Sequence, residues 1–176
     1  MGRRAFVAEK ILEAAFDLVA REGYEAVSTR DIATRAGVGP ASMYRHFPSK
    51  EDLGRALYAR AVGPLLHEAA ALEQDPHGFV AGLARLLYAA YDGRPRALAL
   101  LVFPPHEFTP AELDPADPRS LRARLIGCCR GDADRAALLW GALSGPLHDR
   151  YLHQRAGAMA PLAEHVIPLL VRLLPE

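Results

Sequence analysis

Hydrophobic residues recur along this chain at spacings of three and four, which is the period of a helix buried on one side. Between residues 5 and 22, for example, Ile11, Ala15 and Val19 share one face. Gly23 predicts the end of that helix. Similar rows of apolar positions continue to the C-terminus, and no stretch shows the convincing two-residue alternation of a strand. The pattern therefore predicts an all-α protein.

The stretch from Ser28 to Lys50 predicts two short helices joined by a tight turn. Ser28 can cap the first helix, and Asp31 three residues later can complete a capping box. Gly37 favours the left-handed conformation that ends a helix, and Pro40 suits the first position of the next one. Two short helices about a glycine turn are typical of a helix-turn-helix, whose second helix can enter the major groove of DNA.

The two faces of the second short helix differ in chemistry. Met43 and Phe47, four residues apart, form the side that is expected to pack inward. The opposite side carries one small residue, two hydroxyl groups and a guanidinium: Ala41, Ser42, Tyr44 and Arg45. An arginine can discriminate guanine by roughly 1–3 kcal/mol through a bidentate contact, so Arg45 is a candidate for reading bases. The alternative is an ordinary solvated face, since helix-turn-helix geometry also occurs in proteins that never touch DNA.

A fourth helix is expected to begin after Ser49, which has the form of an N-cap with Asp52 three residues later. Lys50 lies in its first turn, where the helix dipole favours anions and not cations. A bound phosphate would explain this lysine, because the free backbone amides and the ammonium would both face it. The helix is expected to continue to about Leu72.

Gly63 and Pro64 are expected to interrupt this fourth helix. An interior proline removes one backbone hydrogen bond and clashes with the preceding turn, so we expect a kink or a break there. Two interpretations stay open. The proline either bends the helix as a joint between the first part of the chain and the rest, or merely separates two helices.

The remainder of the chain predicts five more helices and one long loop. The helices are expected over residues 76–92, 95–103, 119–129, 132–153 and 161–174. The loop is expected over 104–118, which contains five of the fourteen prolines. The last two helices are apolar on more than one face, which favours a partner subunit as the second surface that covers them.

Composition is that of a globular chain. Its 176 residues, 51% hydrophobic and 24% charged, suffice for one domain or for a small module joined to a larger one. No run approaches the ~20 apolar residues that a bilayer-spanning helix requires, and the first residues lack the apolar run of a signal peptide. Cys128 and Cys129 are adjacent, which disfavours a disulfide between them and fits a reducing compartment. We therefore expect a cytoplasmic protein with no membrane partner.

Charge is balanced over the whole chain, with 21 basic and 21 acidic residues. Residues 1–62 carry ten Lys or Arg against eight Asp or Glu, a balance of +2, and the remainder balances at −2. If the protein binds DNA, it does so through placed cations and not through a broad basic field. Arg3 and Arg4 form a short basic tip, which is either an arm for phosphates or a solvated terminus.

Signatures of catalytic and metal sites are missing from the sequence. No glycine-rich phosphate loop is present, and Ser144 is misplaced for a nucleophile elbow. The seven histidines do not pair at metal-binding spacing, and His148 and His153 fall on different helix faces. The two cysteines are better interpreted as small buried hydrophobic residues than as a redox pair. An enzyme is therefore disfavoured, and neither a metal nor a cofactor is expected.

Residues 5–54 resemble the DNA-binding domain of the TetR family of bacterial transcriptional regulators. The matching positions are Ile11, Ala15, Gly23, Tyr24, Ser28, Ile32, Ala33, Ala36, Gly37, Val38, Tyr44, Phe47, Lys50 and Glu51. They cover about the first third of the chain. Gly39 departs from the pattern, because the family usually has a serine or threonine there to cap the recognition helix. That loss costs about a few tenths of a kcal/mol.

The resemblance implies an all-helical homodimer. It implies an N-terminal three-helix helix-turn-helix DNA-binding domain over residues 1–48 and a C-terminal helical ligand-binding and dimerisation bundle over 49–176. The residues that it places on DNA, mostly on backbone phosphates, are Arg30, Ser42, Tyr44, His46 and Lys50. Ala41 and Arg45 would face bases, and the start of the recognition helix, Gly39 and Pro40, completes the candidate set.

Beyond residue 60 the family diverges, so the resemblance transfers no pocket residue. From periodicity alone, the candidates for lining a ligand pocket are Leu83, Leu87, Phe103, Leu125, Trp140 and Leu143. The leading hypothesis is a repressor that binds a palindromic double-stranded DNA operator as a dimer and is released by a small apolar or aromatic effector. The second is an architectural DNA-binding protein without an effector, and the third is an enzyme that reuses the bundle.

Overall fold

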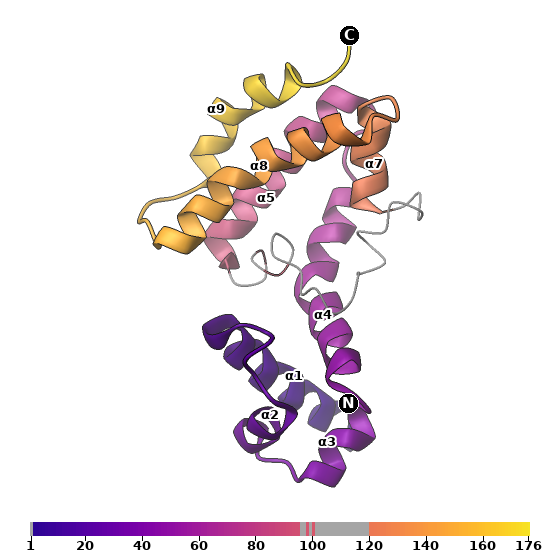
Figure 1. Cartoon of the computed structure of the whole chain (residues 1–176), viewed down its shortest axis with the longest axis vertical. Helices are drawn as coiled ribbons and strands as arrows, with labels where there is room; N and C mark the ends of the chain where they lie inside the picture. Colours follow the sequence, from indigo (N-terminus) through magenta and orange to yellow (C-terminus); the bar gives the residue numbers. More distant parts are fainter. Residues whose placement is uncertain (1, 96–97, 99, 101–119) are drawn as a thin grey trace. The chain divides into compact units, whose positions relative to one another are not determined.

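The computed structural model describes residues 2–95, 98, 100 and 120–176, which form two compact units (Figure 1). Regular structure in these residues is α-helical throughout, which confirms the predicted fold class. The helices are α1 (Arg3–Glu22), α2 (Thr29–Ala36), α3 (Pro40–His46), α4 (Lys50–Ala70), α5 (Pro76–Gly93), α7 (Leu121–Cys128), α8 (Ala133–His153) and α9 (Ala160–Val171).

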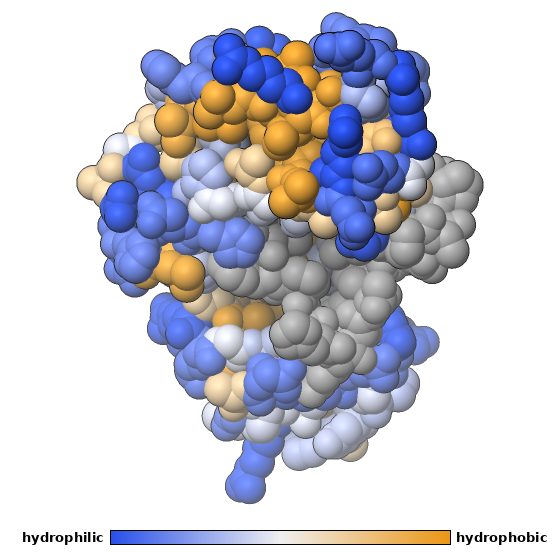
Figure 2. Space-filling view, turned by 45° about the horizontal axis from the view of Figure 1, so that its top comes forward, coloured by the Kyte–Doolittle hydropathy of each residue, from blue (hydrophilic) through white to orange (hydrophobic). Residues whose placement is uncertain are grey.

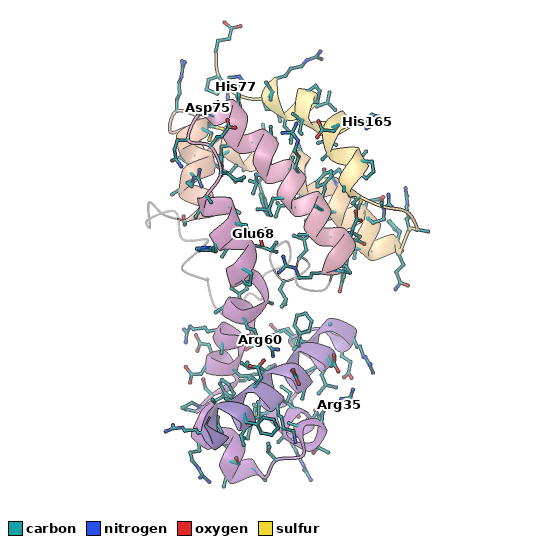
Figure 3. All side chains as sticks on the ribbon, turned by 180° about the vertical axis from the view of Figure 1, so that it is seen from behind. Arg35, Arg60, Glu68, Asp75, His77 and His165 are labelled. Atoms are coloured by element: carbon teal, nitrogen blue, oxygen red, sulfur yellow. The ribbon has the colours of Figure 1, made fainter. Side chains whose placement is uncertain are left out.

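The first unit comprises α1, α2, α3 and the beginning of α4. Its core consists of buried apolar side chains from all four helices: Ile11, Ala15, Val19, Ile32, Ala33, Met43, Leu53 and Leu57. Each large apolar side chain among them contributes about 1.5–3 kcal/mol when it is fully buried. Two ion pairs at the surface, Arg35 with Asp17 at 3.2 Å and Arg60 with Glu9 at 2.7 Å, join α2 and α4 to α1 (Figure 3).

Helix α4 continues through Pro64, so the predicted break at this proline is wrong. Pro64 is exposed, whereas Val62 and Leu65 beside it are buried. Packing of the buried face holds the helix together. The carbonyl that loses its partner belongs to Arg60, which is also exposed, so water can hydrate it. The role of Pro64 as a joint stays a hypothesis.

The two compact units divide within α4, between Arg60 and Ala61. The boundary predicted from the resemblance, between residues 48 and 49, lies before this helix begins and stays a prediction. The first half of α4 therefore packs with the helix-turn-helix, while the second half contributes Val62, Leu65 and Ala69 to the core of the second unit.

In the second unit, α5 lies along α9, and α7 packs against α8. Four large side chains of α5 are completely buried or nearly so: Phe79, Leu83, Leu87 and Tyr88. The Tyr88 hydroxyl donates a hydrogen bond to the carbonyl of Leu143 at 3.0 Å, which joins α5 to α8. This burial raises the pKa of Tyr88 to about 12, because ionisation would place a charge away from water.

The C-terminal end of α4 is held by an arginine from α7. Arg124 donates to the carbonyl of Ala69 at 2.7 Å and to that of Glu73 at 3.3 Å. Its guanidinium lies 3.9 Å from the centroid of the Phe79 ring. Arg124 therefore ties the last turn of α4 and the segment after it to α7 and α5.

Two of the predicted segments fall mainly or wholly outside the described residues, namely the helix over 95–103 and the loop over 104–118. The other predicted helices are confirmed, with ends that differ by a few residues. None of the helices that the structure describes combines the length and the apolar character needed to cross a membrane.

Candidate nucleic-acid interface

The turn between α2 and α3 has the local geometry that the sequence predicted. The Ser28 hydroxyl accepts from the amide of Asp31 at 3.2 Å, and the Asp31 carboxylate accepts from the amide of Ser28 at 3.2 Å. The hydrogen bonds from Ser28 lower the pKa of Asp31, because they stabilise its ionised form. Gly37 has a φ of 64°, and the amide of Val38 reaches back to the carbonyl of Ala33 at 3.0 Å. A glycine adopts this φ without the steric cost that a Cβ imposes.

Helix α3 buries one side and exposes the other. Met43 and Phe47 are 1% and 8% exposed, as predicted for the inward face. On the other side Ala41, Tyr44 and Arg45 are exposed, and Tyr44 keeps 53% of its surface accessible. The remaining predicted contacts of this helix-turn-helix are exposed or half-buried: Arg30, Gly39, Pro40, Ser42 and His46. The predicted side chains of α3 therefore form one accessible strip above the buried Met43 and Phe47.

Gly39 caps α3 with its backbone alone. Its φ of −74° and ψ of 155° are those of an N-cap residue, and no side-chain hydrogen bond accompanies them. The helix also begins with Pro40, whose missing N–H would have had no partner at this position. The structure therefore agrees with the sequence: α3 begins without a side-chain N-cap.

Thr29, which the sequence reasoning missed, belongs to the same strip. It is the first residue of α2, and its hydroxyl lies 3.4 Å from the hydroxyl of Tyr44 on α3. The pair brings the N-terminal end of α2 beside the exposed face of α3. A signal was present in the sequence, since a threonine directly after an N-cap is near the free amides that bind anions.

Lys50, predicted as a phosphate contact, has partners within the protein. Its ammonium donates to the carbonyl of Glu25 at 3.1 Å and lies 4.7 Å from the centroid of the Tyr24 ring. The Tyr24 hydroxyl in turn donates to the carbonyl of Lys50 at 2.9 Å. Ser49 caps the helix as predicted, with the amide of Asp52 donating to its hydroxyl at 2.9 Å. The loop after α1 thus holds both the backbone and the side chain of Lys50.

The chemistry of this surface suits hydrogen bonding to phosphate groups and to the polar edges of bases. Hydroxyl, guanidinium and ammonium groups donate the hydrogen bonds that phosphates and base edges accept. Among the residues that the structure describes, no group of three or more His, Cys, Asp or Glu could hold a metal ion. Burial raises the pKa of Cys128 and of Cys129, which disfavours the reactive thiolate form.

The predicted pocket residues lie in the interior of the second unit. Those that are completely buried or nearly so are Leu83, Leu87, Leu125 and Leu143. Trp140 is half-buried on α8, and Phe103 lies outside the described residues. Burial is shared by residues that line a pocket and residues that only fill a core, so this set stays a prediction.

Comparison with known proteins agrees with the helix-turn-helix. Residues 11–57 match the family model for bacterial regulatory proteins of the tetR family. The HTH-type transcriptional repressor Rv3405c of Mycobacterium tuberculosis is 40% identical over 96 residues, which cover 50% of this chain and 50% of that protein. The repressor KstR of Rhodococcus jostii is 44% identical over 52 residues, 30% of this chain and 24% of that protein. The chain thus spans about half the length, or less, of the curated relatives it matches.

Solved structures share the fold over nearly the whole chain. The multidrug binding protein EbrR, complexed with malachite green, has a TM-score of 0.67 at 24% identity and is covered over 100% of both chains. FadR from Bacillus subtilis, in complex with stearoyl-CoA, has a TM-score of 0.69 at 16% identity over 95% of this chain and 99% of that one. These similarities, at less than 25% identity, concern the fold. The match to the tetR family of bacterial regulatory proteins covers residues 11–57, which include the helix-turn-helix.

Proposed function

We propose that this protein is a ligand-responsive transcriptional repressor. In this proposal a homodimer binds a palindromic double-stranded DNA operator in the cytoplasm and is released by a small apolar or aromatic effector. The observation that carries the DNA-binding part is the exposed strip of α3, where Tyr44 and Arg45 project from a helix anchored by buried Met43 and Phe47. A short helix held in this way can enter the major groove and place its arginine at base edges.

Exposed leucines support the dimer. Leu138 and Leu152 on α8 are 68% and 64% exposed, and Leu169 on α9 is 59% exposed. Figure 2 shows hydrophobic residues gathered on the second unit. A second copy of the same helices would cover these exposed apolar side chains. A two-fold dimer would present its recognition helices to two half-sites, which is why the operator is proposed to be palindromic.

The apolar interior of the second unit supports the effector class. The candidate residues from α5, α7 and α8 are aliphatic or aromatic, so they would select a ligand by shape and apolar area. Two proteins of the same fold are bound to malachite green and stearoyl-CoA, both of which have large apolar parts. An effector would release DNA only if it bound the released form more tightly than the DNA-bound form.

The test begins with selection of duplexes from a random library by the full chain. The proposal expects one enriched palindrome, protected in a footprint as two half-sites about one helical turn apart. Malachite green and stearoyl-CoA are then added to that complex as probes, and release by either one supports the effector class. Broad protection without an enriched palindrome would instead favour an architectural DNA-binding protein and overturn the repressor.

A further inference from the structure

The contact between Tyr24 and Lys50 joins the loop after α1 to the first residue of α4. The chain has only two lysines, Lys10 and Lys50. Lys50 is half-buried, and its ammonium lies over the ring of Tyr24 while it donates to the carbonyl of Glu25. The hydroxyl of the same tyrosine donates to the backbone carbonyl of Lys50. Tyr24 therefore contacts both the ammonium and the backbone carbonyl of Lys50.

We propose that Tyr24 is a positioning residue for DNA binding: it holds the Lys50 ammonium ready for a backbone phosphate at the start of α4. This inference rests on the proposed function, because it assigns a role within the DNA-binding surface. A lysine side chain loses rotamer freedom when it is ordered. A side chain that is already ordered before DNA arrives loses less freedom on binding, so the contact is stronger.

The geometry leaves the lysine able to bind. A lysine ammonium has three N–H donors, and one of them points to the carbonyl of Glu25. The others can meet a phosphate while the ring of Tyr24 still supports the cation, since cation–π attraction does not use up a donor. The neighbouring amides at the start of α4 would face the same phosphate.

The competing interpretation is that Tyr24 only fills the core. It is 8% exposed, so its ring does contribute buried apolar area. A phenylalanine would fill the same volume, however, and would lose only the hydroxyl that fixes the first residue of α4. The substitution Tyr24→Phe therefore separates the two roles without creating a cavity.

The first measurement needs no DNA. With lysine labelled by ¹³C, the full chain gives signals from two lysine side chains, and the ring of Tyr24 should shift the ε-methylene protons of Lys50 upfield relative to those of exposed Lys10. Tyr24→Phe should keep most of this shift, and Tyr24→Leu should remove it. If the two lysines have the same shifts in the wild-type protein, the ammonium is not held over the ring and the proposal is overturned.

The second measurement is a double-mutant cycle on a duplex enriched by the wild-type chain. Lys50→Met should weaken binding and reduce the dependence of log K on log salt by about 0.9 for each phosphate contact that is lost. Tyr24→Phe should weaken binding by about two- to tenfold, which is the range expected for one net hydrogen bond. In the Lys50→Met background, the effect of Tyr24→Phe should be clearly smaller, because only the backbone amides at the start of α4 then still depend on the tyrosine hydroxyl. Lys10→Met is the matched control, and Tyr24→Phe should keep its full effect beside it.

An equal loss from Tyr24→Phe in the presence and absence of Lys50 would overturn the proposal, because a residue that only fills the core acts independently of the lysine. Absence of any enriched duplex for the wild-type chain would overturn the proposed function, and the phosphate role of Lys50 with it. The lysine shifts would still report, in that case, whether Tyr24 holds the ammonium.

Discussion

The side chain of Asp92, at the end of α5, caps the N-terminus of α9 through Met159, the residue that directly precedes α9. The two residues are 67 positions apart in the chain. The Oδ1 atom of Asp92 accepts from the amide of Met159 at 2.7 Å, and its Oδ2 atom accepts from the amide of Ala160 at 2.9 Å. Met159, the N-cap residue of α9, makes no side-chain cap hydrogen bond of its own. A bidentate pair between Arg85 and Glu164, at 2.6 and 3.0 Å, joins the same two helices. Helix α9 is therefore fixed on α5 by polar contacts as well as by packing.

We expect Asp92→Ala to lower the free energy of unfolding by about 1–2 kcal/mol, the upper part of the range for a lost N-cap. Two amides lose their acceptor, and a negative charge near the N-terminus of α9 is removed. Urea denaturation followed by circular dichroism measures the change. Asp134→Ala, in the first turn of α8, is the control and should cost less than about 0.5 kcal/mol. Equal effects of the two substitutions would contradict the capping role.

We expect substitutions at Gly37 and at Gly39 to change the stability of the protein in opposite directions, although the two residues lie only two positions apart. A Cβ added at either glycine would meet no atom within 4 Å, so only backbone conformation distinguishes them. Gly37→Ala should destabilise the protein by about 1–2 kcal/mol, because its φ of 64° is left-handed. Gly39→Ser should stabilise it by about a few tenths of a kcal/mol, because a serine at this N-cap can accept from an amide of α3. Thermal unfolding of both variants checks the signs, and the same sign for both would contradict the turn geometry.

The helix-turn-helix was predictable because its determinants are local. The Ser28–Asp31 box, the left-handed Gly37 and the spacing of Met43 and Phe47 all operate within a few residues, where sequence rules apply directly. In the same region the position of Thr29 after an N-cap was a local signal, whereas its contact with Tyr44, 15 residues away, was not predictable from spacing.

Other features escaped prediction because packing decides them. Sequence rules for proline suggested a kink or a break at Pro64, but α4 is not broken there; its neighbours Val62 and Leu65 are buried, and the proline itself is exposed. The contacts of Lys50 with Tyr24 and of Asp92 with Met159 join segments 26 and 67 residues apart, which no periodicity encodes. For the pocket, apolar spacing identified buried leucines without distinguishing a lining from a core.

Arg45 is expected to read a base, so Arg45→Ala should relax preference at one position in each half-site of the enriched operator. One bidentate contact to guanine discriminates by about 1–3 kcal/mol, which corresponds to roughly 5- to 150-fold at that position. Binding to operator variants with each base at that position measures the effect. Arg21→Ala, an exposed arginine in the last turn of α1, is the control and should leave base preference unchanged. Unchanged preference with Arg45→Ala would contradict the assigned recognition face.

If the proposed dimer forms through α8 and α9, a charged side chain introduced on either helix should weaken association. In a two-fold interface each residue occurs twice, so Leu169→Glu removes two buried leucines, each contributing about 1.5–3 kcal/mol. The dissociation constant should rise at least about a hundredfold, as measured by sedimentation equilibrium. Phe6→Glu is a matched control, since Phe6 is 58% exposed but lies on α1 in the first unit. A dimer that survives Leu169→Glu and Leu138→Glu together would contradict this interface.

We expect the free energy of unfolding to fall at alkaline pH because of Tyr88. Its pKa in the folded protein is about 12, above the ordinary value of 10, because burial disfavours the phenolate. The folded state therefore holds the phenolic proton more tightly than the unfolded state does. The resulting stabilisation is complete below pH 10 and is lost as the pH rises from 10 through 12. Two pKa units correspond to about 3 kcal/mol.

The measurement is the urea-unfolding free energy of wild type and Tyr88→Phe at several values between pH 9 and pH 12. At pH 9 the variant should be less stable by about 1 kcal/mol, because the hydrogen bond to the carbonyl of Leu143 is lost. The difference should shrink and then reverse as the pH rises, since phenylalanine has no proton to lose. Burial raises the pKa of Tyr91 as well, so the difference between the two proteins, and not the total slope, isolates Tyr88. Tyr44→Phe, at an exposed tyrosine, should follow the wild type throughout, and a Tyr88→Phe variant that also does so would show that the Tyr88 phenol does not control the alkaline transition.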